Sequence, residues 1–285
     1  MTFREFSTAE AREFIPLPTP DDDKYSRGVL GVITGSEDYP GAAVLGVEAA
    51  IRTGVGMVRY LGAERPTLLV LHRRPEVVTV GGRVQAWLVG SGMDTASRDP
   101  ATTARLRSAL EQPVPVVIDA GALDLIDSST GPAVMTPHHG ELARMFGVQR
   151  AVITADPAGW AVRAAEQWGA TVLLKGAQTF IADSSGCRLS VRSSNGFTAT
   201  AGAGDALGGI LGALVATRRA ENAAERHPVS LARLAATAAV IHREAAHYAG
   251  AGGPFAVLDL AAAVSGVVAG MIGFSSGALS PPLKR

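Results

Sequence analysis

Short apolar segments alternate with alanine-rich segments along most of this chain, and that alternation is the feature that most restricts its fold. Strands are expected at residues 29–34, 86–89, 114–118, 133–136 and 171–174, and helices at residues 41–53, 100–111, 140–146 and 156–168. The apolar segments have the length of buried strands, and the segments between them have helical spacing. Because parallel strands are joined through crossover helices, the pattern predicts an α/β fold with a mostly parallel central sheet and helices on both faces.

The pattern changes after residue 174. Residues 179–192 predict two strands joined by an Asp-Ser-Ser-Gly turn, which is a hairpin rather than a crossover. Three long apolar helices are expected at residues 206–218, 230–248 and 256–273, packed on the sheet and on each other. Since no linker divides the 285 residues, we expect a single three-layer domain over residues 1–285, in which residues 1–24 form an N-terminal arm with a short helix.

The charge balance argues against a polyanionic partner. Lys and Arg number 26, Asp and Glu number 26, and no segment concentrates the basic residues, so neither nucleic acid nor a membrane surface is an expected partner. The single cysteine, Cys187, excludes an internal disulfide and fits a reducing compartment. The charged N-terminus does not match a signal peptide, and residues 260–274 are better explained as a buried helix than as a membrane span. We therefore expect a cytoplasmic protein that acts on a small molecule.

Six segments rich in glycine, acids or other polar residues are expected at one edge of the predicted sheet. They are GSEDYPGAA (35–43), GSGM (90–93), DAGAL (119–123), TPHHGE (136–141), LLKGAQT (173–179) and GAGD (202–205). Any one of them is compatible with an ordinary strand-to-helix turn. Because ligands of open parallel sheets bind beyond the carboxyl ends of the strands, the set predicts a binding site there.

The GAGD segment opens an apolar helix and carries the most informative acid of the chain. Backbone N–H groups of Gly202, Ala203 and Gly204, together with the helix dipole, predict an anion hole for phosphate. Asp205 would accept a proton from a substrate hydroxyl as that oxygen attacks the bound phosphorus. The structural alternative is that Asp205 only caps the helix N-terminus. Neither a P-loop nor a GxGxxG motif is present, because the glycines at 202, 204 and 208 miss that spacing by one residue.

Two further segments supply candidate ligand contacts. Lys175 follows a strand in a chain with few lysines, which favours a phosphate or ribose contact shared with Thr179, although a lysine extending from the sheet edge to solvent is the alternative. Two adjacent histidines cannot easily chelate one metal, so His138 is a candidate substrate contact and no protein metal site is expected. Glu141 has the alternative role of favouring the dipole of the next helix.

Taken together and in this order, the segments resemble the ADP-dependent NAD(P)H-hydrate dehydratases, a branch of the ribokinase-like superfamily. The resemblance runs from Lys24 to about Ala249, and it is carried by GVITGSEDYPGAAVLGVEAAIRTGVGMV, LVGSGMD, VVIDAGAL, MTPHHGELARMFG, LLKGAQT and TATAGAGDALGGILGAL. It implies a ribokinase-like fold and a lyase that converts the S epimer of NADH or NADPH hydrate back to NADH or NADPH. ADP would be the co-substrate, AMP and phosphate the other products, Mg²⁺ the metal and a homotetramer the assembly.

The resemblance also implies roles for individual positions. The hydrate would contact Ala43, Gly92, His138 and Asp205, and the adenylate would contact Lys175, Gly176, Ala177, Gln178, Thr179 and Gly204. Three segments depart from the family pattern, since GSGMD replaces GPGLG, GAGD replaces GTGD and DAGAL replaces DADAL. Many relatives carry an N-terminal epimerase domain, for which the chain has no room before the first strand. The alternatives are an ATP-dependent kinase of a vitamin precursor or sugar, and a non-catalytic nucleotide-binding regulator.

Overall fold

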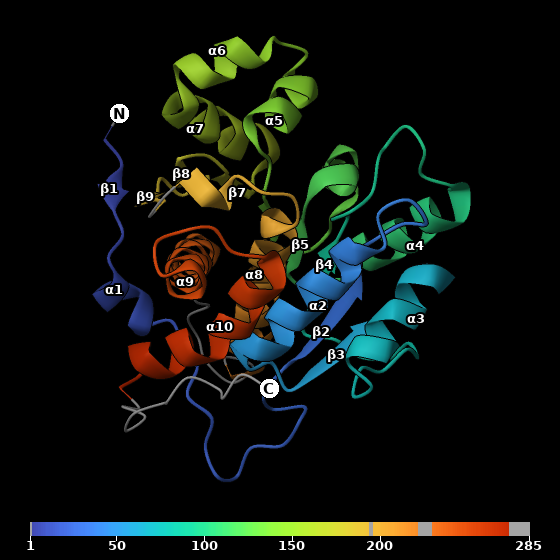
Figure 1. Cartoon of the computed structure of the whole chain (residues 1–285). Coiled ribbons are helices and arrows are strands. Elements are labelled where there is room, and N and C mark those ends of the chain that lie inside the picture. Colours follow the sequence, from blue (N-terminus) through green and yellow to red (C-terminus); the bar gives the residue numbers. More distant parts are fainter. Residues whose placement is uncertain (1, 194–195, 222–229, 274–285) are drawn as a thin grey trace.

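A computed structural model describes residues 2–193, 196–221 and 230–273 of the chain, and these residues form a nine-stranded sheet (Figure 1). The strands lie in the order β1-β9-β8-β7-β6-β5-β4-β2-β3, and β8 runs antiparallel to both of its neighbours while the other pairs are parallel. Their bounds are β1 Arg4–Glu5, β2 Val29–Ile33, β3 Met57–Tyr60, β4 Ala86–Val89, β5 Val116–Ile118, β6 Ala133–Met135, β7 Thr171–Leu174, β8 Gln178–Ala182 and β9 Arg188–Arg192.

Helices connect the strands and follow them. The α-helices are α1 Thr8–Arg12, α2 Gly41–Thr53, α3 Glu64–Arg73, α4 Pro100–Leu110, α5 His139–Phe146, α6 Arg150–Ala155, α7 Pro157–Trp168, α8 Ala203–Glu221, α9 Leu231–Gly250 and α10 Val257–Met271. Two 3₁₀ segments, η1 Ala120–Ser128 and η2 Gly196–Thr198, complete the described elements.

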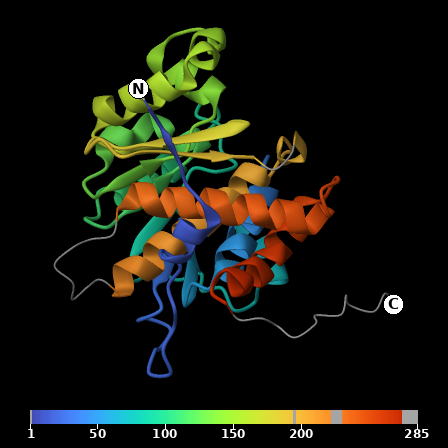
Figure 2. The ribbon, with the colours of Figure 1, turned by 90° about the vertical axis from the view of Figure 1, so that its left-hand side faces the viewer.

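Side chains alternate between the two faces of the sheet, and each face has its own core. In β4, Leu88 packs into the core formed with α2, α8, α9 and α10, whereas Trp87 and Val89 pack into the core formed with α4, α5, α7 and η1. Figure 2 shows that helices cover both faces of the sheet at the hairpin as well. There the yellow strands β8 and β9 lie between the yellow-green helices and the orange-red helix α9. Both faces are thus covered, and the predicted three-layer architecture is confirmed.

The predicted strands and helices lie where the structure has them, within a few residues at their ends, and the predicted hairpin is β8 and β9. Four elements were not predicted, namely β1, β3, α3 and α6. β3 escapes notice because Arg59 interrupts its apolar run, and its guanidinium bonds the Val80 carbonyl at 2.8 Å beside the edge of the sheet. A strand with one polar position is not distinguishable from a loop by apolar run length alone.

Two helix predictions need correction. The helix predicted at residues 206–218 begins at Ala203 in the structure, so Gly204 and Asp205 lie within its first turn. The helix α10 ends at Met271 and therefore contains most of the apolar stretch at residues 260–274. Phe274 lies outside the described residues. Leu260 and Val264 are buried, but the following turns of α10 are only partly covered. Within the described part of the chain, none of the helices combines the length and the apolar character that crossing a membrane requires.

Candidate active site

The candidate site lies at β2, the strand from which the chain continues first to one side of the sheet and then to the other. The chain passes from β2 to β3 on one side of β2 and then returns to place β4 on its other side, so that α2 and α4 cover opposite faces of the sheet. The loops that follow β2 and β4 therefore diverge and leave a crevice between them. Gly35 N donates a 2.7 Å hydrogen bond to the Ser91 carbonyl across this crevice. A Cβ on Gly92, whose φ is +66°, would lie 2.3 Å from the Ala42 Cβ, so only glycine fits there.

Asp119 anchors a buried charged cluster at the same edge. Its carboxylate accepts hydrogen bonds from Ser91 Oγ (2.9 Å), Thr136 Oγ1 (2.8 Å) and Lys175 Nζ (2.7 Å), and the residue is 3% exposed. Burial alone would raise the pKa of Asp119, but the charge of Lys175 and these hydrogen bonds outweigh it and hold the pKa below its usual value. The acid therefore stays ionised, and it connects the ends of β4, β5, β6 and β7.

Lys175 lies at the centre of that cluster. Burial disfavours its charge, but Asp119 and Glu141, whose Oε2 is 3.9 Å from Nζ, keep the pKa of Lys175 above the usual value. The side chain is only 20% exposed, so it does not extend from the sheet edge to solvent. A Cβ built on Gly204 would lie 3.5 Å from Nζ, which places the ammonium beside the first turn of α8. The structure thus brings the predicted lysine and the predicted anion hole together.

The predicted anion hole contains two glycines whose positions differ. Gly202 has φ +93°, and a Cβ there would lie 2.5 Å from Leu45 Cδ1, so this position needs glycine for conformation and for space. Gly204 is helical, and an added Cβ would meet only the Lys175 ammonium. Of the predicted donors, the N–H groups of Ala203 and Gly204 belong to the helix terminus, where α-helical N–H groups have no intrahelical partner, whereas Gly202 precedes the helix. Ala203 N bonds the Thr200 carbonyl at 3.3 Å.

Asp205 is the third residue of α8 and does not occupy the cap position, so the capping alternative is wrong. In the part of the chain that the structure describes, no hydrogen bond to its carboxylate is found. Partial burial, followed by repulsion from Asp119, raises the pKa of Asp205 to about 7, with Lys175 opposing and Glu141 adding to the rise. A carboxylate with this pKa can exchange a proton with a substrate near neutral pH.

A cavity of about 510 Å³ opens in front of the lysine turn and the start of α8. Of the predicted adenylate contacts, it is lined by Lys175, Gly176, Ala177, Thr179 and Gly204, and also by Ala203 of the anion hole. Gln178, which pairs with Arg192 in the hairpin, does not line it. The predicted adenylate contacts therefore share one cavity except for Gln178, whereas Gly202 and Asp205 are not among the residues that line it.

The same cavity includes residues that the sequence did not single out. Arg150 comes from α6, Arg192 from β9, and His242 and Arg243 from α9. They were missed because they do not follow strands that end at the site, and no local motif marks them. One signal was available for His242, which directly follows the run of alanine and aliphatic residues from Ala238 to Ile241 in its helix.

The predicted hydrate contacts are placed unequally. His138 lines the cavity with an imidazole that is 53% exposed, and it also caps α5, since Glu141 N donates to His138 Nδ1 (3.0 Å) and His138 N donates to Glu141 Oε2 (2.7 Å). The structural role expected for Glu141 is thereby confirmed. Gly92 is partly buried against α2, and Ala43 is fully buried beneath the loop after β2. Their contact with a substrate stays a prediction.

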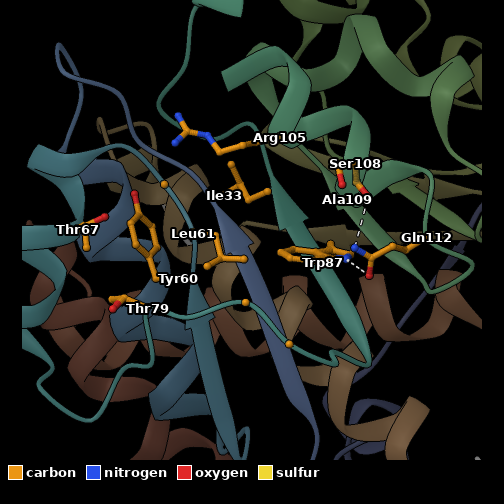
Figure 3. Close-up of a pocket in the computed structure, with 13 residues that line it drawn as sticks. Ile33, Tyr60, Leu61, Thr67, Thr79, Trp87, Arg105, Ser108, Ala109 and Gln112 are labelled. Carbon is orange, nitrogen blue, oxygen red and sulfur yellow. Dashed lines mark hydrogen bonds between the residues drawn. The ribbon is translucent and has the colours of Figure 1, made fainter. Parts of the chain in front are cut away.

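A second cavity, of about 450 Å³, lies between α4 and the end of β3 (Figure 3). Several of its polar side chains already have protein partners. Trp87 Nε1 donates to Gln112 Oε1 at 3.1 Å, Gln112 Nε2 donates to the Ser108 carbonyl at 3.3 Å, and Arg105 donates to Thr102 Oγ1 at 2.8 Å. None of the six segments predicted to form the site contributes to its lining. The first cavity is therefore the better candidate for the reaction.

Comparison with known proteins gives one consistent result. Residues 30–258 match the family model described as NAD(P)H-hydrate dehydratase. The chain is 44% identical over 214 residues to the bifunctional NAD(P)H-hydrate repair enzyme Nnr of Mycobacterium tuberculosis, which covers 71% of this chain and 44% of that protein. It is 32% identical over 232 residues to the ADP-dependent (S)-NAD(P)H-hydrate dehydratase of Xanthomonas campestris, with 73% and 79% covered.

A solved structure supports the same fold. The ADP/ATP-dependent NAD(P)H-hydrate dehydratase from Bacillus subtilis, co-crystallised with ATP and Mg²⁺, superposes with a TM-score of 0.82 at 23% identity and covers 95% of this chain and 99% of that one. The predicted ribokinase-like fold is thereby confirmed. The chain spans less than half the length of the mycobacterial relative, of which 44% is matched.

Proposed function

The chain belongs to the NAD(P)H-hydrate dehydratase family, and from this membership we propose that it is a lyase of metabolite repair that dehydrates the S epimer of hydrated NADH and NADPH at the expense of ADP. One observation carries the proposal. Asp205, with a pKa raised to about 7, stands in the first turn of the helix that the GAGD segment opens, beside the Lys175 ammonium and a cavity of about 510 Å³.

In this proposal, ADP occupies the cavity. Its terminal phosphate meets the N–H groups at the start of α8 and the Lys175 ammonium, which Asp119 holds at 2.7 Å. Backbone donors and a fixed cation stabilise the charge of a transferring phosphoryl group without reorganising during the reaction. The adenosine half then lies against the turn from Gly176 to Thr179, toward α9.

Asp205 activates the hydroxyl on the hydrated nicotinamide ring. It accepts the hydroxyl proton as the oxygen forms a bond to the terminal phosphorus of ADP, and the bond from that phosphorus to the oxygen of AMP breaks. The ring nitrogen lone pair then expels the phosphorylated oxygen as phosphate, and a proton leaves the neighbouring ring carbon to restore the double bond. The sum is hydrate plus ADP giving NADH or NADPH, AMP, phosphate and a proton.

Magnesium does not fit a resident site on this chain. Among the residues that the structure describes, no group of three or more His, Cys, Asp and Glu could hold a metal ion. The acid closest to the lysine turn, Asp119, is buried and fully used by Ser91, Thr136 and Lys175. We propose instead that Mg²⁺ arrives bound to the diphosphate of ADP, since this ion is commonly held through substrate phosphates.

The proposal extends to assembly and location. We infer a homotetramer in the cytoplasm, as the family resemblance implies, with no nucleic acid or membrane as partner. Size-exclusion chromatography with light scattering would test the assembly, because a monomer or dimer at micromolar concentration contradicts it.

The deciding experiment mixes the purified protein with NADH hydrate, magnesium and either ADP or ATP, and follows recovery of dihydronicotinamide absorbance. Wild-type protein should restore NADH with ADP, at a rate that rises with pH up to about 7 as Asp205 loses its proton. Asp205→Asn should lower kcat by about 10²–10⁴-fold, the usual contribution of a general base, while ADP still binds. Lack of recovery with either nucleotide would rule out the dehydratase, and phosphorylation of another small molecule would favour a kinase.

A further inference from the structure

His242 contacts the first residue of α8 from the neighbouring helix α9. It lies on α9, lines the nucleotide cavity with one edge, and its Nε2 is 2.9 Å from the carbonyl oxygen of Ala203, the first residue of α8. No family feature used above assigns a role to this histidine. The contact joins α8 and α9 through two residues that are 39 positions apart in the sequence.

The chemistry of the contact fixes the state of the imidazole. A carbonyl oxygen can only accept, so Nε2 must carry the hydrogen. Burial lowers the pKa of His242 to about 4, with the Ala203 hydrogen bond opposing and the charge of Lys175 adding to the fall. At neutral pH the ring is therefore neutral, with its one N–H directed at Ala203, and it puts no additional positive charge beside the phosphate.

The acceptor is one end of the peptide unit whose other end is the Gly204 N–H. A trans peptide is planar, and its C=O and N–H point in opposite directions. The orientation of the Ala203 carbonyl thus sets the orientation of the Gly204 N–H, which belongs to the predicted anion hole. Within α8 the Ala203 carbonyl also accepts the helical hydrogen bond from Leu207 N, and His242 adds a second contact from outside the helix to a peptide unit that no Cβ at Gly204 restricts.

We propose that His242 is a positioning residue that holds the Ala203–Gly204 peptide with its N–H toward the phosphate of the bound nucleotide. This inference rests on the proposed function, because it takes ADP as the ligand of the cavity. Without the hydrogen bond from Nε2, only the helical bonds of the first turn hold this peptide, and we expect its N–H to align less well with the phosphoryl group.

Removal of the donor should weaken phosphate binding and leave nucleoside binding intact. In His242→Leu, the affinity for ADP should fall about tenfold or more, which corresponds to the loss of one hydrogen bond to a charged group, whereas the affinity for adenosine stays within about twofold. His242→Gln, whose side-chain amide can donate to the same carbonyl, should recover most of the ADP affinity. The exposed His247 of the same helix provides the matched control His247→Leu.

The experiment measures ADP and adenosine affinities calorimetrically for the four proteins, with thermal unfolding to verify folding, and adds kcat and KM for the hydrate. Selective loss of ADP affinity and of kcat in His242→Leu, with rescue by Gln, supports the proposal. Equal loss of ADP and adenosine affinity, absence of rescue, or an unchanged ADP affinity overturns it. Both affinities are independent of turnover. Wild-type protein that binds ADP without dehydrating the hydrate would therefore refute the proposed function alone.

Discussion

At the scale of single residues, the site depends on how two acids with different surroundings divide their roles. Asp119 is buried against a cation and two hydroxyl groups, so its pKa falls and it stays ionised. Asp205 is partly buried, and the negative charge of Asp119 disfavours a second one nearby, so its pKa rises to about 7. Acids whose environments shift their pKa values apart are suited to separate tasks in catalysis. Asp119 positions Lys175, and Asp205 is free to move a proton.

The raised pKa of Asp205 also predicts how stability depends on pH. The folded state binds this proton more tightly than the unfolded chain, whose pKa is near 3.8, so the contribution of Asp205 to stability falls as pH rises from about 4 to about 7. Asp205→Asn lacks this penalty. Its melting temperature should therefore rise relative to wild type across that window and keep a constant advantage above pH 7. A difference between Asp205→Asn and wild type that does not change across this window would contradict the prediction.

The two glycines of the GAGD segment should respond oppositely to alanine. Gly202→Ala should destabilise the fold by about 1–3 kcal/mol, because the new Cβ meets Leu45 at 2.5 Å and φ is +93°. Gly204→Ala should fold as well as wild type, since its Cβ makes only an ordinary contact with the Lys175 ammonium. We expect it to lose ADP affinity nonetheless, because that methyl group occupies space beside the phosphate. Chemical denaturation and ADP titration of both variants would check this, and a stable Gly202→Ala would be the contrary result.

At the scale of elements, α2 and α8 hold the two halves of the crevice together. A Cβ on Gly209 would lie 2.1 Å from the Gly46 carbonyl, and a Cβ on Gly46 would lie 3.3 Å from the carbonyl of Asp205. The helices therefore approach backbone to backbone just beyond the catalytic turn (Figure 1). This close packing fixes the position of the N-terminus of α8 relative to α2 and to the loop that precedes α2. It therefore affects the candidate site as well as the core.

A pair of glycine substitutions tests that packing. Gly209→Ala should lower stability by about 1–3 kcal/mol by forcing α2 and α8 apart. Gly266→Ala, on the exposed side of α10 where no atom lies within 4 Å of a new Cβ, should raise it by about 0.5–1 kcal/mol through helix propensity. Urea unfolding of the two variants measures both effects. Equal stability of the two would show that the helices are not in close contact.

At the scale of the whole molecule, two cavities differ in the helices that line them. The cavity of about 510 Å³ lies between the hairpin, α8 and α9, whereas the cavity of about 450 Å³ lies between α4 and the edge strand β3 (Figure 3). Only the first contains the turn of Lys175 and the start of α8. The distribution of these residues over the molecule supports the proposal that the nucleotide binds in the first cavity.

Amide hydrogen exchange should show which of the two cavities binds the nucleotide. Addition of ADP with magnesium should slow amide exchange in residues 175–179, 203–207 and 239–243, because a ligand that binds only the folded state suppresses local opening where it binds. Residues 105–112, at the second cavity, serve as an internal control and should be unchanged. Protection concentrated at residues 105–112 would place the nucleotide in the wrong cavity and contradict the proposed site.

The sequence alone indicated the alternation of most strands and helices along the chain, the edge of the sheet at which the six segments gather, and Asp205 as the proposed general base. These follow from short-range physics, because apolar periodicity, glycine turns and helix termini are properties of a few consecutive residues. The same local signals failed at β3, where one arginine hides the strand, and at α8, which begins three residues before the apolar run.

Only the tertiary structure decided which side chains meet. The pairing of Lys175 with Asp119 spans 56 residues, and the bond from His242 to Ala203 spans 39. The burial of Ala43 and the dual role of His138 as cap and cavity residue likewise depend on their neighbours in space. Such contacts are set by strand order, by register and by the packing of helices on each face. None of these is encoded in the spacing of residues along a single segment.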